Sequence, residues 1–336
     1  MSDVATRTPL ILPAPDAQVI EVTGEDRLTH LDATTTQALK GARPGTATAA
    51  LVLDANGNPL AMFDVLVLPD RVWLVSPSVD VTAVVMDVIA ARTFLADARF
   101  APLDHTVVRT TLPPDDARRL WSGTTTVPDP GAVRTTPSGG SAIAADAAGT
   151  LTLVGPAAEV ATLVERLRGA GAVDADDAAT DAWHVAAGRP AWGREVAPPH
   201  LPEELGLLPT HVHLAKGCYP GQEAVARMWM LGRPRRRLAR VRVADTGGAL
   251  LPVTPGWSTG EGRETVEVTR LADDGTALAF VPGASEPGGT LTTTDAAITV
   301  LEVVGDDPVP PGHDPAMKRR RDRGRAPAVT GQGPVA

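Results

Sequence analysis

The sequence predicts an α+β protein in which two sheet-plus-helix units precede a small all-β unit. Strand-like runs are followed by helix-like runs twice, over residues 19–91 and again over residues 141–187. This order favours α+β layers over a parallel nucleotide-binding sheet. From residue 238 onward only short β-rich runs remain, separated by Gly/Pro turns, which is typical of a small β-barrel or sandwich. A chain of 336 residues is too long for one small core, so two or three domains are expected.

The first unit combines strands with two helices. Apolar spacing and turn residues predict its elements at residues 19–22, 25–31, 46–53, 60–68, 72–75 and 79–91. Asn56-Gly57 lies between two of these strands, and Asn-Gly between apolar runs is the strongest short-range signal for a β-hairpin. The last element carries Val and Ile along one stripe, which is the pattern of a helix with one buried face.

The second unit follows a stretch rich in Pro, Gly and Thr at residues 123–140. Its strands are expected near residues 141–145 and 150–154, and its helices at residues 156–169 and 176–187. The repetition of strands and then helices argues for α+β layers.

These patterns divide the chain into three parts. A folded module is expected at residues 1–232, with a sub-boundary near 123–140, and a β-barrel at residues 233–305. Residues 306–336 consist mostly of Pro, Gly, Arg and Lys with almost no large apolar side chain. Such a segment cannot bury enough surface to offset its ordering entropy, so a disordered tail is expected there.

Composition and charge exclude several classes of protein. Hydrophobic residues make up 43% of the chain and charged residues 21%, as in ordinary globular proteins. The net charge of −9 should repel nucleic acid and anionic lipid. No apolar run reaches the ~18 residues of a transmembrane helix, and residues 1–10 contain no apolar leader. A cytoplasmic protein without a membrane partner is therefore expected.

Cys218 is the sole cysteine, which excludes an internal disulfide and a self-sufficient thiolate cage for zinc or an iron–sulfur cluster. It lies in the segment K-G-C-Y-P-G-Q-E at residues 216–223, a tight loop after which a helix is expected at residues 222–230. Backbone amides at a helix start, together with Lys216, favour a thiolate. A buried, inert cysteine is the alternative from spacing alone.

The segment at residues 216–223 resembles the K-G-C-Y-x-G-Q-E signature of the YgfZ family. Members of this family are folate-binding relatives of the glycine-cleavage T-protein and are linked to the maintenance of iron–sulfur enzymes. Further matching segments lie on both sides of the signature, at residues 24–26, 53–57, 187–195, 201–207 and 225–227. The resemblance therefore spans roughly residues 17–305.

The resemblance implies an aminomethyltransferase-like folate-binding module of intertwined sheet-plus-helix units, with tetrahydrofolate or a one-carbon derivative in a central channel. It implies catalytic roles for Cys218, Asp64 and Lys216. Asp64 stands where the T-protein has its folate-facing aspartate, and a partly buried carboxylate can hold pterin N–H groups or act as a base. A solvated strand-edge aspartate is the alternative. Ser76 stands where the T-protein usually has asparagine, which weakens the case for full aminomethyl transfer.

Further cofactor-binding residues implied by the resemblance are Glu195, Tyr219, Gln222, Glu223 and Arg227. Glu195 matches a pterin-binding glutamate, whose carboxylate suits the 2-amino and N3 donors of the ring. An exposed loop acid is the alternative for this residue. Arg227 is a candidate partner for the glutamate tail of folate or for Glu223, and a plain helix-surface arginine is the alternative.

Three functions are compatible with these residues. The first is a tetrahydrofolate-binding accessory protein in the assembly or repair of iron–sulfur client enzymes, centred on Cys218 and with or without turnover of its own. The second is a folate-dependent aminomethyl- or methyltransferase, for which Asp64 is essential and Cys218 is dispensable. The third is a tRNA-modification partner that uses the arginine-rich residues 233–242. The net charge and the lack of interleaved aromatic residues favour a solvated strand edge for that stretch.

Four histidines are candidate metal ligands, namely His184, His200, His211 and His213. The last two alternate on a β-like segment and so share one face. No third ligand has convincing spacing, and the sequence therefore predicts no metal site.

Overall fold

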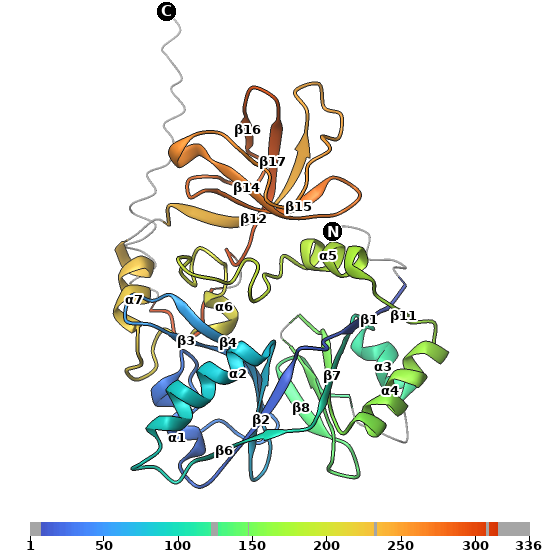
Figure 1. Cartoon of the computed structure of the whole chain (residues 1–336), viewed down its shortest axis with the longest axis vertical. Coiled ribbons are helices and arrows are strands. Elements are labelled where there is room, and N and C mark those ends of the chain that lie inside the picture. The colour runs from blue at the N-terminus through green and yellow to red at the C-terminus, as the bar shows by residue number, and fades with distance from the viewer. Residues whose placement is uncertain (1–7, 122–126, 147, 232–233, 307–308, 315–336) are drawn as a thin grey trace, which may run out of the picture.

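The computed structural model describes residues 8–121, 127–146, 148–231, 234–306 and 309–314, in which three sheets are accompanied by short helices (Figure 1). Two sheets make up the N-terminal part, and the third lies across a connecting segment from them. This mixture agrees with the α+β architecture that the sequence predicts. Among these residues no helix combines the length and the hydropathy that a membrane span requires.

The first sheet is antiparallel, with the strand order β3-β4-β5-β2-β6. Its strands are β2 (Gln18–Thr23), β3 (Ala47–Leu53), β4 (Pro59–Val67), β5 (Val72–Ser76) and β6 (Arg99–Leu103). The hairpin predicted at Asn56-Gly57 joins β3 to β4, with Leu53 opposite Pro59. The pattern does not predict β6, because this edge strand is mostly exposed and contains a proline.

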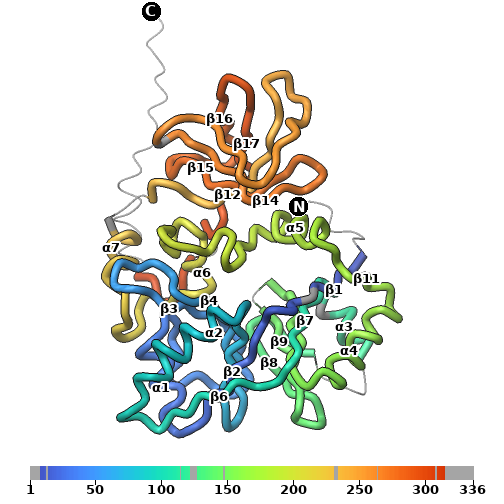
Figure 2. Tube along the Cα trace, viewed as in Figure 1, coloured from blue at the N-terminus to red at the C-terminus, as the bar shows by residue number. Residues whose placement is uncertain are grey.

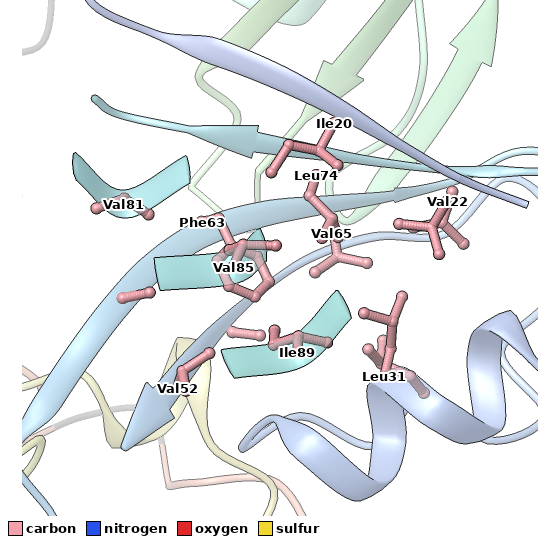
Figure 3. Packing of buried hydrophobic residues seen from close by; sticks show 14 of the residues in the cluster. Ile20, Val22, Leu31, Val52, Phe63, Val65, Leu74, Val81, Val85 and Ile89 are labelled. Carbon is pink, nitrogen blue, oxygen red and sulfur yellow. The ribbon is translucent and has the colours of Figure 1, made fainter. Parts of the chain in front are cut away.

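Helices cover one face of the first sheet. They are α1 (Arg27–Thr34), α2 (Val79–Val84), the π-helical turn η1 (Val85–Ile89) and the 3-10 turn η2 (Ala90–Arg92). Figure 3 shows Leu31, Val85 and Ile89 packed beside Phe63 and Val65 of β4. The long helix predicted after β5 is thus three consecutive helical pieces, and its apolar stripe faces the sheet as expected.

The second sheet has the strand order β11-β1-β7-β10-β9-β8, with two helices on its outer face. Its elements are β1 (Leu10–Pro13), β7 (Thr106–Thr110), α3 (Pro114–Leu120), β8 (Ala132–Thr135), β9 (Ala142–Ala145), β10 (Leu151–Gly155), α4 (Ala157–Gly169) and β11 (Val173–Asp174). Figure 2 shows the chain starting in this sheet, building the first sheet and then returning. The two units are therefore intertwined, and the return falls at residues 104–105, ahead of the predicted sub-boundary at 123–140.

The first two sheets pack face to face through a shared apolar cluster. Val19, Leu66 and Val75 of the first sheet meet Val107 and Ala144 of the second. Because each sheet also has helices on its other face, the order of layers is helix, sheet, sheet, helix.

A connecting segment follows β11 and runs between the paired sheets and the third sheet (Figure 2). Its helices are α5 (Asp177–Ala187), α6 (Leu208–His211) and α7 (Gln222–Leu231). Tyr219 and Trp229 of this segment share one apolar cluster with Leu51 of β3 and Phe280 of the third sheet. The segment therefore joins the first sheet to the third through its own core.

The third sheet is antiparallel and curls around an apolar core of its own (Figure 1). Its strands are β12 (Arg236–Ala244), β13 (Ser258–Thr259), β14 (Val266–Leu271), β15 (Thr276–Pro282), β16 (Thr290–Thr292) and β17 (Ala297–Val303). Buried and partly exposed residues alternate along β14, as expected for a sheet with one face inward. This curled sheet occupies the region where the sequence predicts a small β-barrel.

A buried ion pair holds the third sheet to the connecting segment. Glu195 is fully buried, and its Oε1 accepts a hydrogen bond of 3.0 Å from Nε of Arg270 in β14. Its Oε2 accepts another, of 2.9 Å, from the backbone N–H of Ala191. Arg270 also pairs with Asp181 of α5, which in turn binds Arg194 at 2.8 Å. Each buried charge thus has a charged partner, as buried ions require.

Part of the predicted tail packs on the body of the protein. Arg237 binds Asp306 at 3.0 Å, and the backbone N–H of Leu214 donates to the carbonyl oxygen of Pro311 at 2.8 Å. Composition does not reveal these contacts, because one depends on a backbone carbonyl and the other on a single ion pair. Most of the predicted tail, residues 315–336, lies outside the described residues.

Replacing Arg270 with Met should destabilise the protein strongly, because the Glu195 carboxylate then stays buried without its cation. The expected loss is about 3–5 kcal/mol in the free energy of unfolding, measured by urea denaturation. The double variant Glu195→Gln/Arg270→Met should recover part of this loss, since neither charge remains.

Arg194→Met is the matched control. The Arg194 side chain is 34% exposed, so its removal should cost no more than about 1 kcal/mol. Equal losses for Arg270→Met and Arg194→Met would show that the buried pair does not hold the third sheet.

Candidate functional site

Asp64 lies at the interface between the first and second sheets. Its neighbours Phe63 and Val65 pack on the helices, and side chains alternate along a strand, so Asp64 faces the second sheet. Arg109 of β7 reaches it from that sheet, with Nη2 donating to Oδ2 of Asp64 at 3.0 Å. The Arg109 and Asp64 side chains are 20% and 23% exposed, so the pair is largely buried but keeps access to solvent.

The Asp64–Arg109 pair retains unused hydrogen-bonding capacity. Nε of Arg109 is buried and has no hydrogen-bond partner among the described residues. A buried donor without a partner costs about 1–3 kcal/mol. A ligand atom that accepts a hydrogen bond from Nε would therefore be stabilised at this position.

His211 adds an uncharged imidazole near this pair. It ends α6, its Nδ1 lies 2.7 Å from Oγ1 of Thr210, and its carbonyl accepts a hydrogen bond of 2.6 Å from Oγ1 of Thr36. Desolvation lowers the pKa of His211 to about 4, with the charge of Asp64 raising it and that of Arg189 lowering it. Near neutral pH the imidazole can therefore donate one hydrogen bond and accept another.

Arg189 brings a second cation close enough to act on His211. Its guanidinium pairs with Asp146 and lies 5.6 Å from the ring centre of Trp183 in α5. Its carbonyl oxygen lies 2.7 Å from Nδ1 of His184, whose pKa desolvation lowers to about 4. The interior beside Asp64 thus holds the Arg109 cation and the neutral imidazole of His211, with Arg189 close enough to act on His211. We refer to Asp64, Arg109 and His211 as the inner site.

Sequence reasoning finds Asp64 but not the other two residues of the inner site. Arg109 is 45 residues from Asp64, and its one signal is a lone arginine within the β-rich run T-V-V-R-T. The sequence pattern considers His211 only as a candidate metal ligand and finds no third ligand for it. In the described part of the chain, no group of three or more His, Cys, Asp or Glu side chains is arranged to hold one.

Glu195, predicted to contact the pterin, lies in the buried pair with Arg270. It is 0% exposed, so it is not an exposed loop acid. Both of its carboxylate oxygens already accept hydrogen bonds within the chain. This is the arrangement of a structural residue, and contact with a pterin ring would require an exchange of these partners.

Lys216 is buried against the C-terminal end of α1. Its Nζ donates to the carbonyl oxygen of Thr35 at 2.7 Å, contacts that of Asp32, and lies 3.8 Å from Oδ2 of Asp32. Desolvation lowers the pKa of Lys216, while Asp32 raises it. Carbonyl groups at a helix C-terminus attract cations. The ammonium therefore stabilises the end of α1, whereas the sequence predicts that it supports a thiolate.

Two glycines bring the signature loop against the β3–β4 turn. A Cβ atom on Gly221 would lie 2.5 Å from the carbonyl oxygen of Asp54, and one on Gly57 would lie 2.8 Å from Cβ of Ala224. Both glycines have positive φ, +81° and +87°. The Asn-Gly turn and the signature are therefore in direct contact, at a distance that side chains would prevent.

The other predicted site residues, in the signature and in α7, lie around a pocket or on the surface. Tyr219, Gln222 and Glu223 line a pocket of about 580 Å³. Cys218 is an exposed free thiol, which excludes the buried alternative, and Arg227 is exposed on α7. In the described chain no hydrogen bond or ion pair joins any of them to Asp64. The structure thus separates the predicted site residues into an inner and an outer group.

The arginine-rich strand β12 is largely paired with acids. Three of its arginines form ion pairs within the chain: Arg236 with Glu267, Arg237 with Asp306 and Arg240 with Glu302. They are less available to phosphate groups than the sequence alone indicates.

The fold resembles that of a solved aminomethyltransferase. The structure of glycine cleavage system aminomethyltransferase T from Bartonella henselae aligns with a TM-score of 0.68 and 17% identity, over 87% of this chain and 85% of that chain. Methanococcus jannaschii TBP aligns over 49% of this chain with a TM-score of 0.23, too low to indicate a shared fold. No protein-family profile and no curated protein sequence matches the chain. At this identity the likeness establishes the fold alone.

Stability should fall as the pH falls from about 6.5 toward 4, in part because of His211. Its pKa is about 4 in the folded chain, whereas an unfolded chain binds the proton near pH ~6.5. The unfolded state therefore holds more protons within this window, and stability that is complete above it is lost on acidification. His211→Gln should reduce the loss of unfolding free energy between about pH 7 and pH 5. His105→Gln, a partly exposed histidine outside the inner site, is the control, and an unchanged slope in His211→Gln would contradict the assignment.

Proposed function

We propose that the protein binds a reduced folate, tetrahydrofolate or a one-carbon derivative, at the inner site. The observation that carries this proposal is the Asp64–Arg109 pair, which lies between two sheets with a buried donor left over. The fold shared with aminomethyltransferase T supports it. The resemblance of the signature to the YgfZ family points to the same cofactor.

The chemistry of the inner site fits a pterin ring. The Asp64 carboxylate accepts hydrogen bonds and suits the 2-amino and N3 donors of the ring. Nε of Arg109 donates, and so suits the ring carbonyl, while neutral His211 can serve as donor or acceptor. When bound, tetrahydrofolate supplies a carrier for a one-carbon unit.

Asp64 and Ser76 favour a protein that binds folate without transferring an aminomethyl group. Oδ2 of Asp64 already accepts a hydrogen bond from Arg109, so the carboxylate is held as the partner of an ion pair rather than as a free base. Ser76, which stands at the usual asparagine position, is buried and donates to the carbonyl oxygen of Ser78 at 2.7 Å. An aminomethyl- or methyltransferase is the second candidate, and the position of Asp64 on the inner face of β4 is the observation in its favour.

We further propose that the protein acts in the cytosol as an accessory factor in the assembly or repair of iron–sulfur enzymes. The signature supports this role, and so does the exposed thiol of Cys218. Since the chain has one cysteine, any cluster or persulfide contact at this thiol needs a partner molecule. The paired arginines of β12 give no support to a tRNA partner.

Tetrahydrofolate should bind the wild-type protein, and Asp64→Asn should weaken binding about 10- to 100-fold. The reason is the loss of charge-assisted hydrogen bonds, each worth about 1.5–3 kcal/mol. Calorimetry measures both affinities, with Asp80→Asn, an exposed carboxylate on α2, as the control. Absence of binding to the wild type at millimolar folate would reject the folate proposal. Unchanged affinity in Asp64→Asn would reject only the inner site.

Cys218→Ser should keep the melting temperature and the folate affinity, but should fail to restore iron–sulfur enzyme activity in a deletion strain. The serine preserves the size of the side chain and removes the nucleophilic sulfur. Ala215→Ser, a neighbouring exposed position, is the control and should restore activity in full. Full complementation by Cys218→Ser would make Cys218 an ordinary surface residue.

A further inference from the structure

The pocket at the β3–β4 turn has an apolar interior and a charged rim. Of its lining residues, Leu53 and Tyr219 are buried, Val88 is partly buried, and Arg92 and Glu223 are exposed. Apolar groups therefore lie at depth and opposite charges lie at the opening. The volume of about 580 Å³ is that of a small-molecule site.

Tyr219 offers this pocket a hydroxyl without a partner. The residue is 8% exposed, its ring belongs to the apolar cluster of the connecting segment, and Nζ of Lys216 lies 5.0 Å from the ring centre. Over the described ranges the hydroxyl forms no hydrogen bond. Desolvation raises the pKa of Tyr219 to about 12, so the hydroxyl remains a donor at physiological pH. The hydroxyl is not among the fully buried atoms that lack a partner, so it keeps access to solvent, and a molecule in the pocket that Tyr219 lines can accept its hydrogen bond.

Three charged residues line the pocket, namely Asp54, Arg92 and Glu223. The Asp54 carboxylate already accepts hydrogen bonds from the backbone N–H groups of Asn56 and Asn58 and from the Asn58 side chain, which leaves Arg92 and Glu223 to bind a ligand. Arg92 ends η2, and Glu223 lies in the first turn of α7. Within the described residues neither forms an ion pair, with the other or with any third residue. Gln222 also lines the pocket and adds an amide that can donate and accept hydrogen bonds.

The pocket is separate from the inner site. Leu60, which lines it, and Asp64 are four positions apart in β4, which corresponds to about 13 Å of strand. Asp64 faces the second sheet, whereas Val88 belongs to the helical layer on the opposite face. None of the inner-site residues lines the pocket.

We propose that this pocket binds a zwitterionic small molecule with an apolar body, of the class of an apolar α-amino acid. The body lies against Leu53 and Val88, and a polar atom accepts the Tyr219 hydroxyl. The carboxylate pairs with Arg92 and the ammonium pairs with Glu223. A carboxylic acid would pair with Arg92 alone and an amine with Glu223 alone, whereas a purely apolar molecule would pair with neither residue.

The test is a titration of the full chain with L-phenylalanine, 3-phenylpropionate and 2-phenylethylamine, followed by NMR. The first probe carries both charges and should bind about 3- to 5-fold tighter than either of the others, because it makes one additional ion pair with an exposed residue. Arg92→Gln should remove the advantage of L-phenylalanine over 2-phenylethylamine. Glu223→Gln should remove its advantage over 3-phenylpropionate. Tyr219→Phe keeps the ring and should weaken binding of L-phenylalanine about 3- to 10-fold.

Arg43→Gln and Glu25→Gln, which change exposed charges outside the pocket lining, are the matched controls and should leave all three affinities unchanged. The proposal is overturned if no probe saturates at millimolar concentration, or if the rim variants leave the order of affinities as in the wild type. Both rim residues are exposed, so these variants decide the outcome even if Tyr219→Phe unfolds. Competition between tetrahydrofolate and L-phenylalanine would show a single shared site and would also overturn the separate pocket.

Discussion

The buried pair of Glu195 and Arg270 is the contact on which the position of the third sheet against the connecting segment depends. Nε of Arg270 in β14 donates a hydrogen bond of 3.0 Å to Oε1 of Glu195 in a loop of the connecting segment. Buried charges are stable only when each has a partner, so the loop and the third sheet hold one fixed geometry relative to each other. Asp181 extends the pair to α5 and thus ties the start of the segment to the same strand. If the third sheet moved away, Glu195 would lose its cation, and a carboxylate that stays buried without a cation is strongly destabilising.

The same segment is fixed to the first sheet by small and cationic residues of the signature. Gly221 approaches the backbone of Asp54 more closely than a residue with a side chain could. The Lys216 ammonium donates to the carbonyl oxygen of Thr35 at the C-terminal end of α1. The close approach requires a glycine and the helix end favours a cation, whereas Cys218 and Glu223 are exposed to solvent. The signature thus combines residues that position the loop with residues that remain available for chemistry.

The local sequence pattern predicted those helices and strands that have a clear apolar periodicity or are bounded by characteristic turn residues. The β3–β4 hairpin followed from Asn56-Gly57, and α4 followed from Pro156 at its start and Gly169 at its end. The alternation of side chains along β4 also places Asp64 on the face opposite to that of Phe63 and Val65. The partners of these residues could not be predicted, because Arg109 lies 45 residues from Asp64 and Arg270 lies 75 from Glu195. A sequence pattern shows which side chains share a face of one strand or helix. The charged partner of a side chain depends on how separate elements pack against each other, which the local pattern does not show.

The two candidate sites both depend on β4, but they depend on different contacts of that strand. The inner site requires the packing of the first sheet on the second, since Asp64 and Arg109 come from opposite sides of that interface. The outer pocket requires the docking of the signature loop on the end of the hairpin that contains Leu60. β4 pairs with β3 from Pro59 to Leu66 and with β5 from Asp64 to Val67, so the part of the strand that joins the two sites is held by the β3 ladder. The spacing of the two sites is therefore set by strand geometry rather than by the conformation of a loop.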